Sequence, residues 1–124
     1  MKKKNNEVKI TNGVKLNMDT LMKMDTNGIS LKHEDIERIC MKYKIRELSV
    51  FGSAIRDDFN NKSDIDFLVS FKENSELTLF DLVNLQQEFT CLLDRNVDIV
   101  EKEGLTNPIR KKVILSTAEV LYVY

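Results

Sequence analysis

Residues 51–66 read FGSAIRDDFNNKSDID, with Gly52 and Ser53 near one end and Asp64 and Asp66 at the other. A glycine that directly follows a strand allows a sharp turn and a close approach of the backbone to a ligand. If a short helical turn starts at Ser53, its free N–H groups and the serine hydroxyl can hold phosphate oxygens. The segment therefore predicts an anion-binding turn followed by a pair of carboxylates.

The pair Asp64 and Asp66 lies in Asp64–Phe71, which alternates as a strand does. Residues two apart in a strand share a face, with roughly 6–7 Å between their Cα atoms. Carboxylates this close repel each other unless a cation compensates, and Mg²⁺ prefers such oxygen ligands. Asp98 lies in a further short apolar strand, Val97–Val100, where aspartate is disfavoured. If the two strands are neighbours, three carboxylates converge. Taken alone, Asp64 and Asp66 would favour two solvated aspartates on an edge strand, and Asp98 is equally compatible with an exposed surface residue.

Arg56 lies one turn beyond Ser53 and is a candidate for contacting a phosphate. The alternative is a surface ion pair with Asp57 or Asp58, and the sequence favours neither.

Hydrophobic periodicity and capping signals predict an α+β (or α/β) fold, a small mixed sheet packed with helices. In the last helix, Ile109, Val113 and Ile114 are expected to face inward. The expected elements are a helix from Ser30 to near Lys44, strands at Glu47–Phe51, Asp64–Phe71 and Val97–Val100, helices opened by Thr78 and by Asn107-Pro108, and an extended tail at Val120–Tyr124.

The composition of the chain bounds its class. Its 124 residues fit one domain, and 19 basic against 20 acidic residues give a net charge of -1, which argues against direct nucleic-acid binding. No apolar stretch is long enough to cross a membrane, and no apolar run follows the basic start Met1–Asn6, so we expect no signal peptide. Two isolated cysteines, Cys40 and Cys91, are expected in the core of a cytoplasmic protein.

The joint pattern of Gly52-Ser53, a ten-residue spacer, Asp64-Ile65-Asp66 and a later strand with Asp98 is far more specific than its parts. It resembles the minimal nucleotidyltransferases of the DNA polymerase β superfamily. The resemblance implies a palm-like nucleotidyltransferase fold over residues 30–124. Residues 1–29 are left as an unassigned N-terminal extension, in which we expect one hairpin.

The resemblance implies roles for these residues. Gly52 and Ser53 would bind the triphosphate of ATP, and Asp64, Asp66 and Asp98 would hold two Mg²⁺ ions. Small members of this family act as antitoxins that transfer AMP from ATP to a tyrosine of a HEPN-domain ribonuclease toxin and so neutralise it. One departure from the family pattern is Asp57, which stands where a glycine is common.

Two other functions are compatible with the sequence. An antitoxin that masks its toxin by binding alone would keep the fold without the chemistry, and the extra charge of Asp57 favours this alternative. A nucleotidyltransferase acting on a small molecule is the second alternative. Such enzymes carry a further substrate domain, which we do not expect in a chain of this length.

Overall fold

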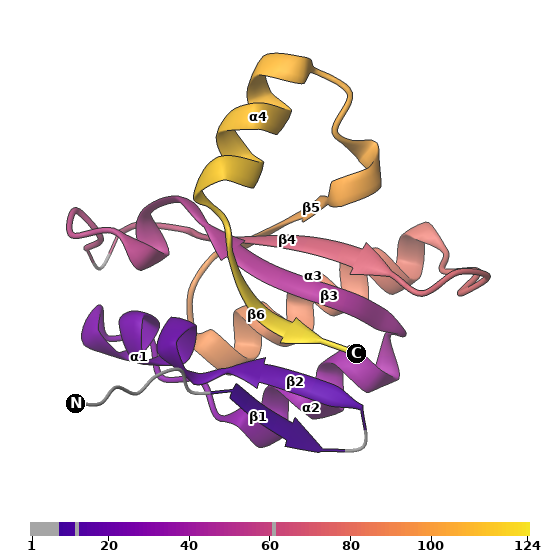
Figure 1. Ribbon diagram of the computed structural model, residues 1–124, viewed down its shortest axis with the longest axis horizontal. Coiled ribbons are helices and arrows are strands. Elements are labelled where there is room, and N and C mark those ends of the chain that lie inside the picture. Colours follow the sequence, from indigo (N-terminus) through magenta and orange to yellow (C-terminus); the bar gives the residue numbers. More distant parts are fainter. Residues whose placement is uncertain (1–7, 12, 61) are drawn as a thin grey trace.

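The computed structural model describes residues 8–11, 13–60 and 62–124. The strands are β1 (Val8–Thr11), β2 (Val14–Asn17), β3 (Ile45–Phe51), β4 (Ile65–Phe71), β5 (Val97–Glu101) and β6 (Glu119–Val123). The helices are α1 (Met18–Thr26), α2 (His33–Lys42), α3 (Leu79–Leu93) and α4 (Pro108–Thr117), with short 3-10 turns η1 (Gly52–Ile55) and η2 (Lys102–Gly104). Within these residues the strands form one sheet in the order β1-β2-β6-β3-β4-β5 (Figure 1). Because β4 and β5 are parallel and the other pairs antiparallel, the expected mixed α+β sheet is confirmed.

The two faces of β4 are buried by different elements. Ile65, Phe67 and Val69 are fully buried in the main core, which α1, α2 and α3 also line. The ring centroids of Phe67 and of Phe89 on α3 are 4.7 Å apart. Leu68 points to the other face, where it packs in a smaller cluster with Leu105 and with Ile114 of α4. Within the part of the chain that the structure describes, the sheet therefore carries α1, α2 and α3 on one face and α4 on the other.

The start of α2 differs from the expectation. The helix begins at His33 with Lys32 at its N-cap position, and Ser30 lies outside it. A capping box at Ser30 would need a side chain three positions later that accepts from the serine N–H. That position holds His33, which has no carboxylate to do so. Glu34 and Asp35 instead place negative charge in the first turn, which the helix dipole favours.

The start of α3 agrees with the expectation. The Thr78 hydroxyl accepts from the Asp81 N–H at 3.2 Å, and the Asp81 carboxylate accepts from the Thr78 N–H at 2.8 Å. On the core side of the helix, Leu85 and Phe89 are fully buried. Of the cysteines, Cys40 is buried as expected, whereas Cys91 on α3 is exposed, so its placement in the core was wrong.

The orientation of α4 was predicted wrongly. Asn107 caps it as expected, accepting from the N–H groups of the two residues after Pro108. Of the three residues expected inward, Ile114 is buried, whereas the side chains of Ile109 and Val113 are 77% and 58% exposed. The stripe of α4 that faces the sheet carries Ile114 and Arg110, which lies four residues earlier. Periodicity alone does not specify which stripe of a short helix packs inward.

The N-terminal segment is built into the same sheet. The expected hairpin is present as β1 and β2, although Asn12 of its expected turn lies outside the described residues, as does Met1–Asn6. Strand β2 pairs with β6, which is the expected extended tail. Helix α1 was not anticipated; Asn17 caps it, and Leu21 and Met24 bury its inner face. The division of the chain at residue 30 stays a prediction. Within the described residues, no helix is long and apolar enough to cross a membrane.

Candidate active site

The turn at Gly52 has a conformation that only glycine adopts easily. Strand β3 ends at Phe51, and the chain enters η1 through Gly52 with φ of +76°, in the left-handed region. A Cβ atom on Gly52 would lie 2.6 Å from Oδ2 of Asp66. The short helical turn anticipated here is present over Gly52–Ile55, although it begins one residue before Ser53. Gly52 is therefore required both by the backbone and by the carboxylate that closes against it.

Two of the three predicted carboxylates are cross-strand neighbours. Asp66 of β4 is in register with Asp98 of the parallel strand β5, and with Phe51 of β3 on its other side. Residues in register on adjacent strands share a face, so the two carboxylates lie side by side. Asp66 is partly buried, whereas Asp98 is exposed. Asp64 is exposed and lies one residue before β4, because the strand begins at Ile65 and not at Asp64 as expected.

The electrostatics of the site centre on Asp66. Burial raises the pKa of its carboxyl above 3.8, and the charges of Asp98 and Asp64 raise it further. The guanidinium groups of Arg56 and Arg110 act in the opposite direction. Asp64 and Asp98 are therefore both close enough to Asp66 to act on its partly buried carboxylate. In the sequence, the run Arg110-Lys111-Lys112 is typical of a solvated helix face, with contact to a triphosphate or an acidic partner as the alternative. The structure places Arg110 near enough to Asp66 to act on the pKa of its carboxyl.

This arrangement fits a magnesium site that is completed by substrate. Among the described residues, no three His, Cys, Asp or Glu side chains already enclose a common point where a metal ion is held. Mg²⁺ does not need such a cage, since it keeps several waters and binds through one or two carboxylates together with substrate phosphates. Repulsion among Asp64, Asp66 and Asp98 is the cost that a divalent cation would relieve. Their assignment as metal ligands stays a prediction.

Arg56 has an ion-pair partner in this structure. Its Nε and Nη2 atoms lie 3.0 and 3.2 Å from the two carboxylate oxygens of Asp58. Both side chains are more than half exposed, so little energy holds this pair together. The surface ion pair considered from the sequence is therefore present, with Asp58 and not Asp57 as the partner. A phosphate contact by Arg56 stays a prediction, and Asp57 is exposed in the turn after η1.

A residue outside the recognised motif supports the turn. The side-chain amide of Asn27, directly after α1, donates to the carbonyl oxygens of Ala54 at 2.8 Å and Arg56 at 3.1 Å. These two bonds hold the end of η1 from the N-terminal segment. The sequence signal at this position, Asn27-Gly28, indicated a turn and nothing more. Contacts between residues 27 positions apart leave no local pattern from which they can be read.

Replacing Asn27 by alanine is expected to destabilise the protein by about 2 kcal/mol, since it removes two bonds that each contribute about 1 kcal/mol. Urea unfolding measures this change. Asn17→Ala is the matched control, because it removes the cap of the same helix without touching η1. A loss of stability no larger than that of Asn17→Ala would mean that the bonds from Asn27 to the turn contribute little.

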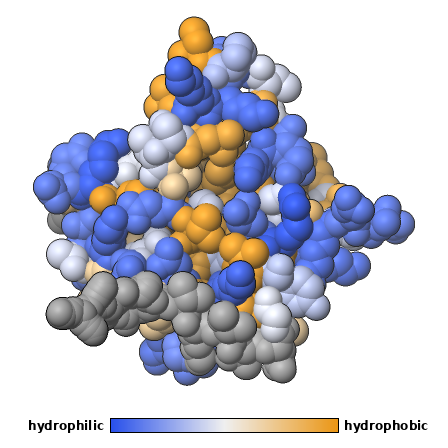
Figure 2. All heavy atoms as spheres, viewed as in Figure 1, coloured by the Kyte–Doolittle hydropathy of each residue, from blue (hydrophilic) through white to orange (hydrophobic). Residues whose placement is uncertain are grey.

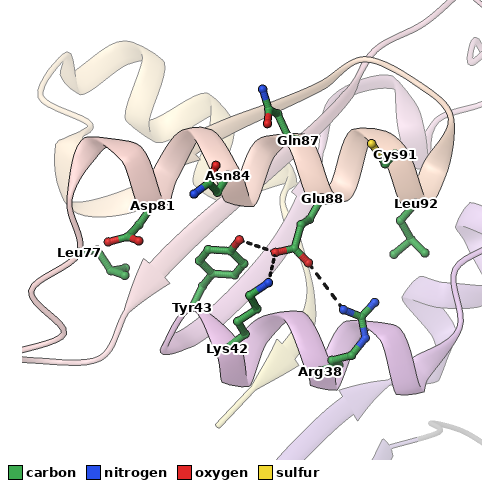
Figure 3. A pocket seen from close by; sticks show the side chains of 10 residues that line it. All are labelled: Arg38, Lys42, Tyr43, Leu77, Asp81, Asn84, Gln87, Glu88, Cys91 and Leu92. Carbon is green, nitrogen blue, oxygen red and sulfur yellow. Dashed lines mark hydrogen bonds and ion pairs between the residues drawn. The ribbon is translucent and has the colours of Figure 1, made fainter.

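A hollow of about 760 Å³ lies between α2 and α3, away from the aspartates. Figure 3 shows Glu88 at its centre, paired with Lys42 at 2.7 Å, with Arg38 at 3.6 Å and with the Tyr43 hydroxyl. Burial and the bond to Glu88 raise the pKa of Tyr43 to about 12. This network ties the two helices together. It lies on the α3 face of the sheet, opposite Asp66, so we assign it a structural role.

Comparison with known proteins decides the family. A model of the family described as polymerase beta, nucleotidyltransferase, matches residues 34–124. The chain belongs to the polymerase beta nucleotidyltransferase family. The resemblance inferred from Gly52-Ser53 and the three aspartates is thereby confirmed.

The relatives of this nucleotidyltransferase are small proteins. It is 37% identical over 98 residues to the protein adenylyltransferase MntA of Thermococcus cleftensis, covering 73% of this chain and 94% of that protein. It is 36% identical over 95 residues to a protein adenylyltransferase of Methanocaldococcus jannaschii, covering 77% of this chain and 96% of the relative.

Solved structures show the same nucleotidyltransferase fold. A minimal nucleotidyltransferase is similar with 34% identity and a TM-score of 0.59, covering 69% of this chain and 85% of that chain. A toxin–antitoxin complex with AMP-PNP is similar at a TM-score of 0.61, with 22% identity, covering 76% of this chain and 75% of that one. The likeness to the toxin–antitoxin complex is a likeness of fold alone.

Proposed function

We propose that this nucleotidyltransferase is an antitoxin that transfers AMP from ATP to a tyrosine hydroxyl of a HEPN-domain toxin. The observation that carries the proposal is the pair Asp66 and Asp98, in register beside the left-handed turn at Gly52. Its relatives named protein adenylyltransferase support the type of transfer. The toxin is supported by a structural neighbour of 18% identity and TM-score 0.54, an MNT antitoxin in complex with the tri-AMPylated HEPN toxin of Shewanella oneidensis.

The chain's own groups divide into those that hold the nucleotide and those that face the acceptor. Gly52 and Ser53 bring backbone N–H groups and a hydroxyl to the triphosphate, and Arg56 leaves Asp58 to pair with a phosphate oxygen. Asp64, Asp66 and Asp98 would hold Mg²⁺, which supplies Lewis-acid activation of the α-phosphate and neutralises the charge on departing pyrophosphate.

The acceptor side of the site is open to another protein. Asp98 is exposed and lies on β5, at the end of the sheet order. An incoming tyrosine hydroxyl can therefore reach the carboxylate of Asp98. As the alternative to holding Mg²⁺, this carboxylate accepts the phenolic proton as the phenolic oxygen bonds to the α-phosphorus. Pyrophosphate leaves with the electron pair of the broken P–O bond.

Binding without chemistry is the second candidate function, and it would arise if the turn failed to accept a triphosphate. Asp57 and Asp58 both follow η1, and the Asp58 carboxylate is already paired with the Arg56 guanidinium. Incubation of the protein with ATP, Mg²⁺ and the product of the neighbouring reading frame, which we expect to be a HEPN protein, separates the two functions when it is followed by intact-mass measurement. Added AMP on the HEPN protein supports transfer. An unmodified toxin that is nevertheless inhibited in the complex supports masking.

The nucleotide and the metal are expected to bind together. Mg²⁺ alone should bind weakly and Mg²⁺ with ATP more tightly, because the triphosphate supplies oxygen ligands that the aspartates do not. The double variant Asp64→Asn plus Asp66→Asn should lose this linked binding in calorimetry while its circular dichroism spectrum is unchanged. Asp25→Asn on the exposed side of α1 is the control. Unchanged binding of Mg²⁺ with ATP by the double variant would remove these aspartates from the metal site.

A further inference from the structure

Helix α4 combines exposed apolar side chains with basic ones. Ile109 and Val113, one turn apart, are 77% and 58% exposed, and Ile114 is its only buried residue. Lys112 lies beside this stripe and Lys111 lies on the opposite flank of the helix, because residues two apart do not share a helix face, and the helix contains no acidic residue. Figure 1 shows α4 projecting from the sheet, and Figure 2 shows hydrophobic side chains gathered over it among hydrophilic ones. We call Ile109, Lys111, Lys112 and Val113 the α4 surface.

The α4 surface lies on the side of the sheet that carries the aspartates. Ile114 packs against Leu68, which is two residues from Asp66 in β4 and therefore on the same face. A protein bound to α4 is thus held beside the carboxylates to which its hydroxyl has to be delivered.

We propose that the α4 surface docks the acceptor protein, which presents an apolar patch bordered by acidic side chains. This inference rests on the function proposed above and adds the place and chemistry of the contact. The chain as a whole has a net charge of -1, so the positive charge of α4 is a local feature of its surface. Such a surface complements acidic residues on a partner protein and orients its approach. Ile109 and Val113 supply the apolar area that protein interfaces bury at their centre.

Other occupants fit the α4 surface less well. A symmetric pairing of two copies through α4 would bring Lys111 and Lys112 close to the same residues of the second copy, because such an interface is built from one patch twice. A nucleic acid would use the lysines, but its phosphates would gain little from exposed Ile109 and Val113. A protein of the stated chemistry uses both the charge and the apolar side chains.

The test is binding of the product of the neighbouring reading frame, which the proposed function expects to be a HEPN protein. Binding is measured without ATP so that affinity is independent of chemistry. Ile109→Gln plus Val113→Gln should weaken binding at least about tenfold, the effect expected of central interface residues. Lys111→Glu plus Lys112→Glu should slow association and reduce its dependence on salt. Phe80→Gln is the matched control, since Phe80 is 82% exposed on α3, which packs on the opposite face of the sheet. All three variants should bind ATP as the wild type does.

Unchanged affinity of the Ile109→Gln plus Val113→Gln variant would overturn the proposal, as would a loss of binding confined to Phe80→Gln. Self-association of the wild type that the α4 variant abolishes would assign the surface to a second copy. Binding of single-stranded RNA that the lysine variant abolishes, with toxin affinity unchanged, would assign it to nucleic acid. AMP transfer by the wild type at saturating HEPN protein is scored separately, so failure of the chemistry is distinct from failure of the docking surface.

Discussion

Replacing Asp66 by asparagine is expected to lower AMP transfer by about a thousandfold or more, because the substitution removes a charged ligand from a metal-assisted displacement. Asp66 is the most buried of the three carboxylates and the one on which the others act. Intact-mass measurement of the HEPN protein after timed incubation with ATP and Mg²⁺ gives the rate. In cells that express both proteins, the variant should protect poorly against the toxin. If Asp66→Asn protected fully and no AMP appeared with the wild type, the antitoxin would act by binding alone.

The same substitution is expected to increase stability near neutral pH. Burial and the two neighbouring aspartates raise the pKa of Asp66 above its ordinary value of 3.8. A carboxyl whose pKa is higher in the folded state binds its proton more tightly there, so stability falls as pH rises from 3.8 through the raised pKa. Asparagine does not ionise and avoids this loss. Urea unfolding should therefore show a more stable variant near neutral pH and no gain below pH 3.8. A variant that is less stable near neutral pH would contradict this electrostatic account.

Replacing Gly52 by alanine is the second change with a large expected effect. A left-handed residue with a side chain costs roughly 1–2 kcal/mol, and the added Cβ would lie 2.6 Å from Oδ2 of Asp66. Either the turn or the carboxylate has to move, so we expect AMP transfer to fall about a hundredfold or more. Rates of transfer and urea unfolding measure the two consequences.

Gly13→Ala separates the backbone strain from the collision. Gly13 has φ of +83°, and no atom lies within 4 Å of the Cβ it would carry. Its variant should lose about 1 kcal/mol of stability and keep full transfer activity. Similar activity of the Gly13→Ala and Gly52→Ala proteins would mean that the contact between Gly52 and Asp66 has no catalytic consequence.

The parts of the site that the sequence predicts are those with a local or periodic origin. A glycine after a buried strand indicates the turn at Gly52, and strand alternation puts Asp66 on the face opposite Ile65. Periodicity does not show which strands are neighbours, so the convergence of Asp66 and Asp98 was predicted only on the condition that their strands are adjacent. The parallel register of β4 and β5 confirms that they are. The metal and phosphate roles of these residues stay predictions, since they concern ligands and not the fold.

The features that the sequence did not predict depend on distant partners. Asn27 contacts η1 through hydrogen bonds that span 27 and 29 residues, which no window of sequence reveals. Arg110 approaches Asp66 only because α4 packs through Ile114, and apolar residues on two stripes of that helix made its orientation ambiguous. Helix α1 was missed because its apolar residues, including Leu21 and Met24, keep no clean helical period.

The pairing of β2 with β6 affects solubility as well as architecture. Strand β6 contains the fully buried Leu121 and Tyr122, and it is hydrogen-bonded by β3 on one side and β2 on the other. A fragment beginning at residue 30 would leave one row of its backbone donors and acceptors unpaired beside apolar side chains. Open edges of this kind add strands from other molecules and lead to aggregation. The N-terminal hairpin therefore covers the edge of β6, and the edge strand of the described sheet on this side becomes β1, which is only four residues long.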